Sequence, residues 1–267
     1  MRPLTPLEFN AAPAGRLAFP ANARIAIWGQ SNAVGRADRT DISASPLSSD
    51  AGLATYDGGT FSRTYIWTGS SYDLLQPSVN NGAAAGQFGV EFGLAVRWER
   101  ETASGNLYLE KWASSGLSIT HGYFTPGVWP YTTAVSERGQ ADAWLVSHSI
   151  TLAQESWIWI QGEADSAMSQ GTYQGYLETL MAGRITDGFQ TATDKSVLVQ
   201  MAVGSASYGA GVAAAKSAIA AGDPTYVTAL ASDLYMKSDN LHYSGRGIVQ
   251  VAYNCFETLY GAGHLSV

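Results

Sequence analysis

Cysteine is nearly absent from this sequence, with Cys255 the only one among 267 residues. A single thiol excludes an internal disulfide, and with it a small disulfide-stapled scaffold. With only four histidines, the chain also lacks the residues for a cysteine-rich zinc cluster. A chain of this length can bury one hydrophobic core that is large enough to be stable without such cross-links.

Charge is also scarce, because charged residues make up 14% of the chain against about 25% in an average soluble domain. Basic residues are the scarcer kind: 15 of them stand against 22 acidic residues, which gives a net charge of −7. A negative surface repels the phosphates of nucleic acids and of anionic lipids. We therefore expect neither nucleic acid nor a membrane as a partner.

Long hydrophobic runs are missing as well. The uncharged stretch of residues 197–215 is broken by polar residues and three glycines, so no membrane span is predicted. Four prolines interrupt the first twenty residues, where a secretory signal would need an apolar run. We assign residues 1–22 to a proline-rich arm and residues 23–267 to a single domain.

What the sequence does contain is an alternation of short buried strands with amphipathic helices. Five apolar runs rich in β-branched and aromatic residues predict strands over residues 24–28, 107–112, 157–160, 197–203 and 226–231. Helical spacing of apolar residues predicts helices near residues 90–98, 132–153, 173–185, 211–221 and 248–259. The alternation predicts an α/β fold, a three-layer αβα sandwich around a five-stranded, mostly parallel, doubly wound sheet.

Residues 36–87 depart from this alternation, since they are rich in Ser, Thr, Gly and Asp and show little periodicity. A loop of this length is usually functional or disordered. Its aromatic residues indicate a packed excursion, which is either a surface that stacks on sugar rings or a satellite core under the loop. These aromatic residues are Tyr56, Phe61, Tyr65, Trp67 and Tyr72.

Polar residues that follow the predicted strands are the candidates for chemistry, because ligands bind at the carboxyl ends of parallel strands. Ser31, in Gly29-Gln30-Ser31-Asn32, lies at a tight strand-to-helix turn that can expose its hydroxyl as a nucleophile. A serine at such a turn also serves as an ordinary helix cap, so the position alone is weak evidence.

Asp239 and His242 lie three residues apart, directly before the last predicted helix. At this spacing a carboxylate can hold one imidazole nitrogen and leave the other free to take a proton from a serine. The alternative is a hydrogen-bonded structural histidine beside an ordinary helix-capping aspartate.

The predicted strand at 157–160 runs into an amide and two carboxylates, Gln161, Glu163 and Asp165. The two carboxylates are a poor glycosidase pair, because groups so close in one loop cannot straddle a sugar ring. The Gln161 amide is a neutral donor suited to an oxyanion hole. The small-residue loop 114–118 offers backbone N–H groups as a second donor.

Three motifs in order, Gly-Gln-Ser-Asn at 29–32, Trp-Ile-Gln-Gly-Glu-Ala-Asp at 159–165 and Asp-Asn-Leu-His at 239–242, resemble those of the SGNH hydrolases. The resemblance is to the branch of sialate O-acetylesterases and acetylxylan esterases of carbohydrate esterase family 6, and it covers roughly residues 23–260. It implies the flavodoxin-like fold of that superfamily.

By this resemblance Ser31 is the nucleophile, His242 the general base and Asp239 its orienting acid. The oxyanion hole consists of the N–H groups of Ser31 and Gly116 and the side chain of Gln161. No metal and no cofactor are implied.

The sequence departs from the wider superfamily at two of these positions. Gln161, in Gln-Gly-Glu, stands where an asparagine is usual, and Gly89 competes with Gly116 as the second donor. The resemblance also implies three supporting residues, Gln30, Asn32 and Glu163. Of these, Glu163 braces the Ser31 turn and is a second candidate for the acid partner of the histidine.

The implied function is that of a serine esterase that removes short acyl groups, most often acetyl, from a sugar or polysaccharide. One alternative is a non-catalytic carbohydrate-binding module of the same fold, for example in a phage tail or on a cell surface. Intact Ser31, Asp239 and His242 favour activity over that alternative. A lipase-like or thioesterase-like member of the superfamily is disfavoured by Gln-Gly-Glu.

Overall fold

The computed structural model describes residues 22–43, 61–102, 104–230, 235–263 and 265. Nearly all of the predicted N-terminal arm and Tyr56 of the predicted excursion lie outside these residues. In the part of the chain that the structure describes, no helix is long and apolar enough to cross a membrane.

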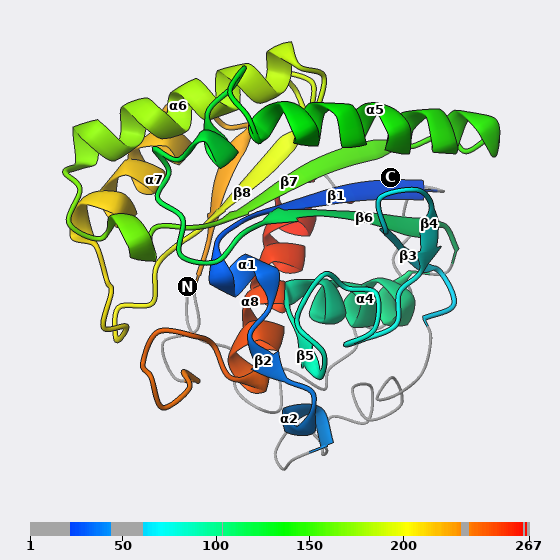
Figure 1. Ribbon diagram of the computed structural model, residues 1–267, viewed down its shortest axis with the longest axis horizontal. Coiled ribbons are helices and arrows are strands. Elements are labelled where there is room, and N and C mark those ends of the chain that lie inside the picture. The colour runs from blue at the N-terminus through cyan, green and yellow to red at the C-terminus, as the bar shows by residue number, and fades with distance from the viewer. Residues whose placement is uncertain (1–21, 44–60, 103, 231–234, 264, 266–267) are drawn as a thin grey trace.

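A seven-stranded sheet forms the middle layer (Figure 1), with the strand order β4-β3-β6-β1-β7-β8-β9. The strands are β1 (Asn22–Gly29), β3 (Thr64–Trp67), β4 (Tyr72–Leu74), β6 (Asn106–Ala113), β7 (Gln154–Ile160), β8 (Lys195–Val199) and β9 (Tyr226–Ala229). All neighbouring pairs are parallel except β3 and β4, which are antiparallel. A separate two-stranded sheet pairs β2 (Ala37–Asp38) with β5 (Gln87–Phe88).

Helices cover both faces of the large sheet (Figure 1). One face carries α5 (Tyr131–Ser147), α6 (Gln170–Thr186) and α7 (Ala210–Gly222), and the other carries α4 (Val90–Glu101) and α8 (Gly245–Gly261). The shorter helices are α1 (Ser31–Val34), α2 (Thr40–Ser43) and the 3-10 turns η2 (Gly122–Phe124) and η3 (Glu163–Asp165). The predicted three-layer αβα architecture is confirmed.

The central strand β1 shows why the core forms where it does. Ile25 and Ile27 point to the core under α4 and α8, whereas Ala26 and Trp28 point to the core under α5, α6 and α7. Successive side chains of a strand face opposite sides, so a strand covered on both faces must be apolar throughout. Full burial of one large apolar side chain stabilises the fold by roughly 1.5–3 kcal/mol.

The sheet has two more strands than the five predicted, and both lie in the segment 36–87. β3 and β4 span only four and three residues in a region rich in Ser, Thr and Gly, so neither gives a long apolar run. The satellite-core interpretation holds for Phe61 and Tyr72, which are buried, whereas Tyr65 and Trp67 are half-buried. Phe61 packs edge-on against Phe92 of α4 with ring centroids 5.8 Å apart.

Two predicted elements end at least four residues earlier in the structure. β8 stops at Val199 instead of Val203, where the chain turns into the loop before α7. α5 stops at Ser147 instead of residue 153, because Ser149 adopts a positive φ of 56° that a helix does not continue.

Candidate active site

The turn after β1 brings the predicted nucleophile to the carboxyl edge of the sheet. Gly29 has a φ of +145°, and a Cβ at this position would lie 1.9 Å from the carbonyl oxygen of Ile160 in β7. Only glycine permits this approach, which the N–H of Gln30 completes with a hydrogen bond of 3.0 Å to the same oxygen. Ser31 then begins α1 and is 5% exposed, between the ends of β6 and β7.

The predicted base and acid form a direct pair in the loop before α8. Nδ1 of His242 lies 2.7 Å from Oδ2 of Asp239. The other carboxylate oxygen of Asp239 accepts the backbone N–H groups of Leu241 and His242, at 2.9 and 3.0 Å. Burial disfavours the charge of Asp239, but the hydrogen bonds from His242 and Leu241 outweigh it and lower its pKa to about 2. A carboxylate charged at neutral pH therefore orients the imidazole.

Asn32 joins the serine turn to the histidine loop. Its amide nitrogen donates to the carbonyl oxygen of Leu241 at 3.2 Å, and its side-chain oxygen accepts the N–H of Tyr243 at 3.2 Å. Because Asn32 follows Ser31 in sequence while Leu241 and Tyr243 flank His242, these bonds hold the two segments together. Within the described residues the Ser31 hydroxyl makes no hydrogen bond with the imidazole.

Glu163 contacts the serine turn through Asn32. One carboxylate oxygen accepts the second N–H of the Asn32 amide at 2.7 Å, and the other is buried without a partner among the described residues. In the structure the imidazole of His242 pairs with Asp239 and not with Glu163. The side-chain oxygen of Gln30 accepts the N–H of the residue after Glu163, which ties the same two loops together.

Two backbone N–H groups are available for a developing oxyanion. The N–H of Ser31 and the N–H of Gly116 make no hydrogen bond with any described residue. Gly116 has a φ of +74°, and no atom lies within 4 Å of the place where its Cβ would be. The N–H of the competing Gly89 is already donated to Glu91 at 2.7 Å. The geometry therefore favours Gly116 over Gly89.

The side chain of Gln161 is held inside the protein in this structure. It is 1% exposed. Its amide nitrogen donates to the carbonyl oxygen of Leu117 at 3.2 Å and to the carboxylate of Asp165, and its oxygen accepts the hydroxyl of Tyr173 at 2.7 Å. Both amide hydrogens are thus used. The oxyanion role that the sequence predicts requires the amide to exchange one of these bonds.

Asp165 has a role that sequence reasoning missed. Its carboxylate accepts the hydroxyl of Ser118 at 2.5 Å, the N–H of Ile119 at 2.8 Å and the amide of Gln161. With 3% of Asp165 exposed, the carboxylate has no free side for a substrate. It instead ties the loop that contains Gly116 to the end of β7. The spacing in the sequence carries no signal of these partners.

Lys216 of α7 was also missed. The residue is 1% exposed, and its ammonium group donates to the carbonyl oxygens of Gln161 and Val199, at 2.6 and 2.7 Å. Burial lowers the pKa of Lys216 to about 8. A buried cation thus links the backbone at the ends of β7 and β8 through these two hydrogen bonds. The only signal in the sequence was a single charged residue in an otherwise Ala-rich helix.

Comparisons with known proteins bear on the family and the fold of the chain. A family model described as carbohydrate esterase, sialic acid-specific acetylesterase, matches residues 24–260. Among solved structures, a protein from Arabidopsis thaliana superposes with a TM-score of 0.65 at 18% identity, over 91% of this chain and 99% of that one.

Two further structures are similar. A carbohydrate acetylesterase from Xanthomonas citri has a TM-score of 0.56 at 15% identity, over 90% of this chain and 56% of that one. NanS has a TM-score of 0.54 at 12% identity, over 92% of this chain and 100% of that one. At these identities the likenesses show the fold. No curated protein matches the sequence significantly.

Proposed function

The chain belongs to the carbohydrate esterase, sialic acid-specific acetylesterase family, and from this premise we propose that it is a serine esterase that removes O-acetyl groups from a sugar or polysaccharide. The reaction passes through an acyl-enzyme intermediate. The proposal treats residues 23–267 as one catalytic domain.

In the proposed mechanism, Oγ of Ser31 attacks the ester carbonyl carbon while the free nitrogen of His242 takes the hydroxyl proton. Asp239 holds the other imidazole nitrogen and stabilises the imidazolium. The tetrahedral oxyanion accepts the N–H groups of Ser31 and Gly116. The sugar oxygen then leaves with the proton from His242. Water repeats the sequence on the acetyl-serine and releases acetate.

Gln161 completes the oxyanion hole by exchanging one hydrogen bond. Its bond to the carbonyl oxygen of Leu117 is the weaker of the two that its amide donates, because Leu117 offers a neutral acceptor at 3.2 Å whereas Asp165 offers a carboxylate. When negative charge develops on the substrate oxygen, that oxygen becomes the better acceptor. The charged Asp165 keeps the rest of the amide in place.

The observation that carries the proposal is the link through Asn32. This side chain bonds to both neighbours of His242 while it adjoins Ser31, and His242 is in turn oriented by Asp239 at 2.7 Å. A pure binding module has no physical need for this coupling of a serine turn to an oriented imidazole.

Acetate release tests the proposal. Purified protein and its Ser31→Ala variant are incubated with O-acetylated sialic acids, acetylxylan and acetylated bacterial polysaccharides, and free acetate is measured. We expect the wild-type protein to release acetate from at least one substrate and the variant to release none above background. Folded wild-type protein that releases acetate from none of them would favour the carbohydrate-binding alternative.

A further inference from the structure

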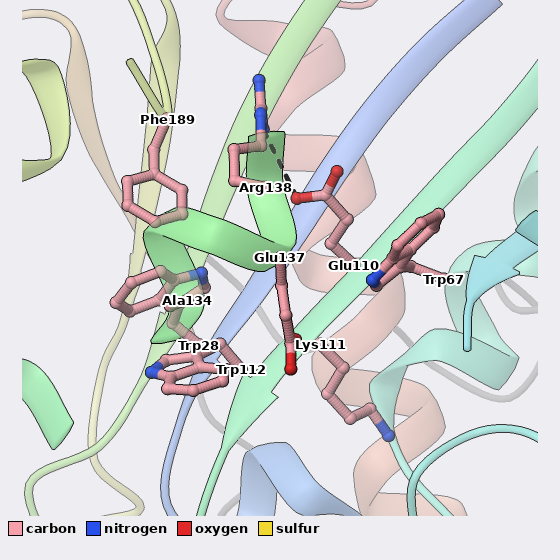
Figure 2. Close-up of a pocket in the computed structure, with 9 residues that line it drawn as sticks. All are labelled: Trp28, Trp67, Glu110, Lys111, Trp112, Ala134, Glu137, Arg138 and Phe189. Carbon is pink, nitrogen blue, oxygen red and sulfur yellow. Dashed lines mark hydrogen bonds and ion pairs between the residues drawn. The ribbon is translucent and has the colours of Figure 1, made fainter. Parts of the chain in front are cut away.

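A small pocket lined by both polar and apolar side chains lies on the α5 face of the sheet, close to the carboxyl ends of β1 and β6 (Figure 2). Trp67 of β3, Trp112 of β6 and Glu137 of α5 are among the residues that line it. Its volume of about 20 Å³ has room for one water molecule or one hydroxyl group. None of these three residues takes part in the mechanism above.

The pocket holds an unused hydrogen-bond donor. Nε1 of Trp67 is buried and has no partner among the described residues. Figure 2 shows the nitrogen-bearing edge of this ring on the side of Glu137. A buried N–H group without an acceptor is unfavourable, so this indole favours an oxygen atom in the pocket.

The pocket also holds an unused acceptor. Glu137 is half-buried, and its carboxylate makes no hydrogen bond or ion pair within the described part of the chain. Figure 2 shows its side chain extending from α5 toward Trp112. The neighbouring Arg138 is already engaged by Glu110, Asp142 and Glu155. Burial raises the pKa of Glu137, as expected for a carboxylate that lacks a cationic partner.

The pocket adjoins the candidate active site through two strand ends. Trp112 lies four residues before Gly116, and Trp28, which also lines the pocket, lies three residues before Ser31. Trp112 is half-buried and stacks on Tyr123 at 4.4 Å, whereas Trp28 is 1% exposed and lies in the core, with its ring 6.2 Å from that of Trp112. A sugar unit bonded near the acetylated one can therefore contact Trp112 but not Trp28.

We propose that this pocket is a subsite for a neutral sugar unit of the substrate glycan, in which one hydroxyl group accepts from Trp67 and donates to Glu137. A hydroxyl group has one donor and two acceptor lone pairs, so a single group satisfies both protein atoms and fits the volume. Aromatic rings pack well against the C–H faces of a pyranose. The carboxylates of Glu137 and Glu110 disfavour a sugar that carries its own carboxylate.

This subsite rests on the esterase function proposed above, and two variants test it. Trp67→Phe removes the N–H but keeps an aromatic ring, and Glu137→Ala removes the acceptor. For an acetylated polysaccharide we expect KM to rise about fivefold in the first and about tenfold or more in the second, because hydrogen bonds to charged groups are the stronger ones. Hydrolysis of p-nitrophenyl acetate, which is too small to reach the pocket, should stay within twofold.

Glu178→Ala provides the matched control, since it removes an exposed carboxylate from α6 whose contact is with Gln174. This variant should change the kinetics of neither p-nitrophenyl acetate nor polysaccharide hydrolysis. Equal losses on p-nitrophenyl acetate and on the polysaccharide in the pocket variants would mean that the pocket only supports the fold. Unchanged KM for the polysaccharide in both variants would mean that the pocket holds water alone. Either result overturns the proposal.

A binding measurement separates this proposal from the esterase function, because it needs no turnover. Saturation-transfer NMR with the Ser31→Ala protein is used to titrate xylohexaose and cellohexaose. We expect binding of at least one hexasaccharide, weakened fivefold or more by Trp67→Phe and by Glu137→Ala. Such binding without any esterase activity would contradict the proposed function but support the subsite. Absence of binding to both sugars, or binding that the variants do not weaken, overturns the subsite.

Discussion

Ser31 is the residue on which the proposed chemistry depends, and it is directly testable. The Ser31→Ala variant should lose at least about 10³-fold in kcat while remaining folded, because removing a serine nucleophile leaves only the contribution of the oxyanion hole and of binding. A fluorophosphonate probe should label Ser31 in the wild-type protein, and mass spectrometry of the digested protein identifies the labelled residue.

Ser115→Ala is the control for this labelling. Ser115 lies on the neighbouring loop, and its hydroxyl accepts from Arg36 at 2.5 Å. The control variant should still be labelled at Ser31. Labelling of any other serine in the wild-type protein would assign the nucleophile elsewhere.

The Asp239–His242 pair predicts the pH dependence. The pKa of Asp239 is lowered to about 2, so this carboxylate stays charged from pH 4 upward and contributes no titration step there. The acid limb of kcat/KM should therefore show no step from this carboxylate between pH 3 and 5. A pH-rate profile on p-nitrophenyl acetate measures it. A step in that range would show that Asp239 is not held as the structure indicates.

The kinetics of a Gln161 variant distinguish between two roles of this side chain, an oxyanion donor and a structural link. If its amide turns to the oxyanion, Gln161→Ala should lower kcat on the order of 10²–10³-fold with little change in KM, because the bond is made to charge that develops in the transition state. Steady-state kinetics of the variant and of Ser118→Ala, which removes only one bond to Asp165, make the comparison. A rise in KM alone would make Gln161 a substrate contact.

At the scale of elements, the buried lysine of α7 links stability to pH. The pKa of Lys216 is about 8 in the folded protein and 10.5 when the residue is unperturbed. Between these values the unfolded chain binds a proton that the folded protein lacks, so stability rises with pH. The free energy of unfolding of the wild type minus that of Lys216→Met should increase from pH 8 upward. It should level off near pH 10.5, about 3 kcal/mol above its value at lower pH. Urea unfolding of both proteins at pH 7, 8.5 and 9.5 tests this. A difference that is constant or falls with pH would contradict it.

The elements that the sequence predicted well are those buried on both faces. β1, β6 and β7 lie in the middle of the sheet, so every side chain must be compatible with a core and the apolar run is visible. β3 and β4 lie at the edge, and β3 alternates buried with half-buried residues over only four positions. So short a pattern does not stand out within a segment rich in Ser and Gly.

The candidate site also contains residues that the sequence could predict and residues that it could not. Ser31 and the Asp239–His242 pair could be found because each follows a strand or precedes a helix, where parallel topology gathers side chains at one edge. The engagement of Gln161 and the role of Asp165 could not, because both depend on how the loop after β6 packs against the end of β7. Contacts of that kind are set by tertiary packing, which no local spacing encodes.

At the scale of the whole molecule, the distribution of aromatic residues bears on which acyl groups are accepted. Four tryptophans, Trp28, Trp112, Trp157 and Trp159, lie in the strands β1, β6 and β7 that lead to the site. Trp28, Trp157 and Trp159 are 0–1% exposed and belong to the core under α5, α6 and α7. The acyl preference must therefore be argued from the residues around the serine turn.

The side chains bonded to or flanking the serine turn are polar, and this predicts a preference for short acyl groups. Gln30, Asn32 and Glu163 are joined to one another's loops by hydrogen bonds, and Asp239 holds the imidazole on the far side. An apolar acyl pocket would gain roughly 0.8 kcal/mol for each buried methylene, or about fourfold in kcat/KM. A polar site gives no such gain and loses hydrogen bonds when a longer chain displaces them.

Across p-nitrophenyl acetate, butyrate and octanoate, kcat/KM should therefore be highest for acetate, fall steeply at butyrate and approach background at octanoate. Because the sign of the trend follows from the polarity of the site, a maximum at octanoate would require an apolar channel beside Ser31 and would move the assignment to a lipase-like enzyme.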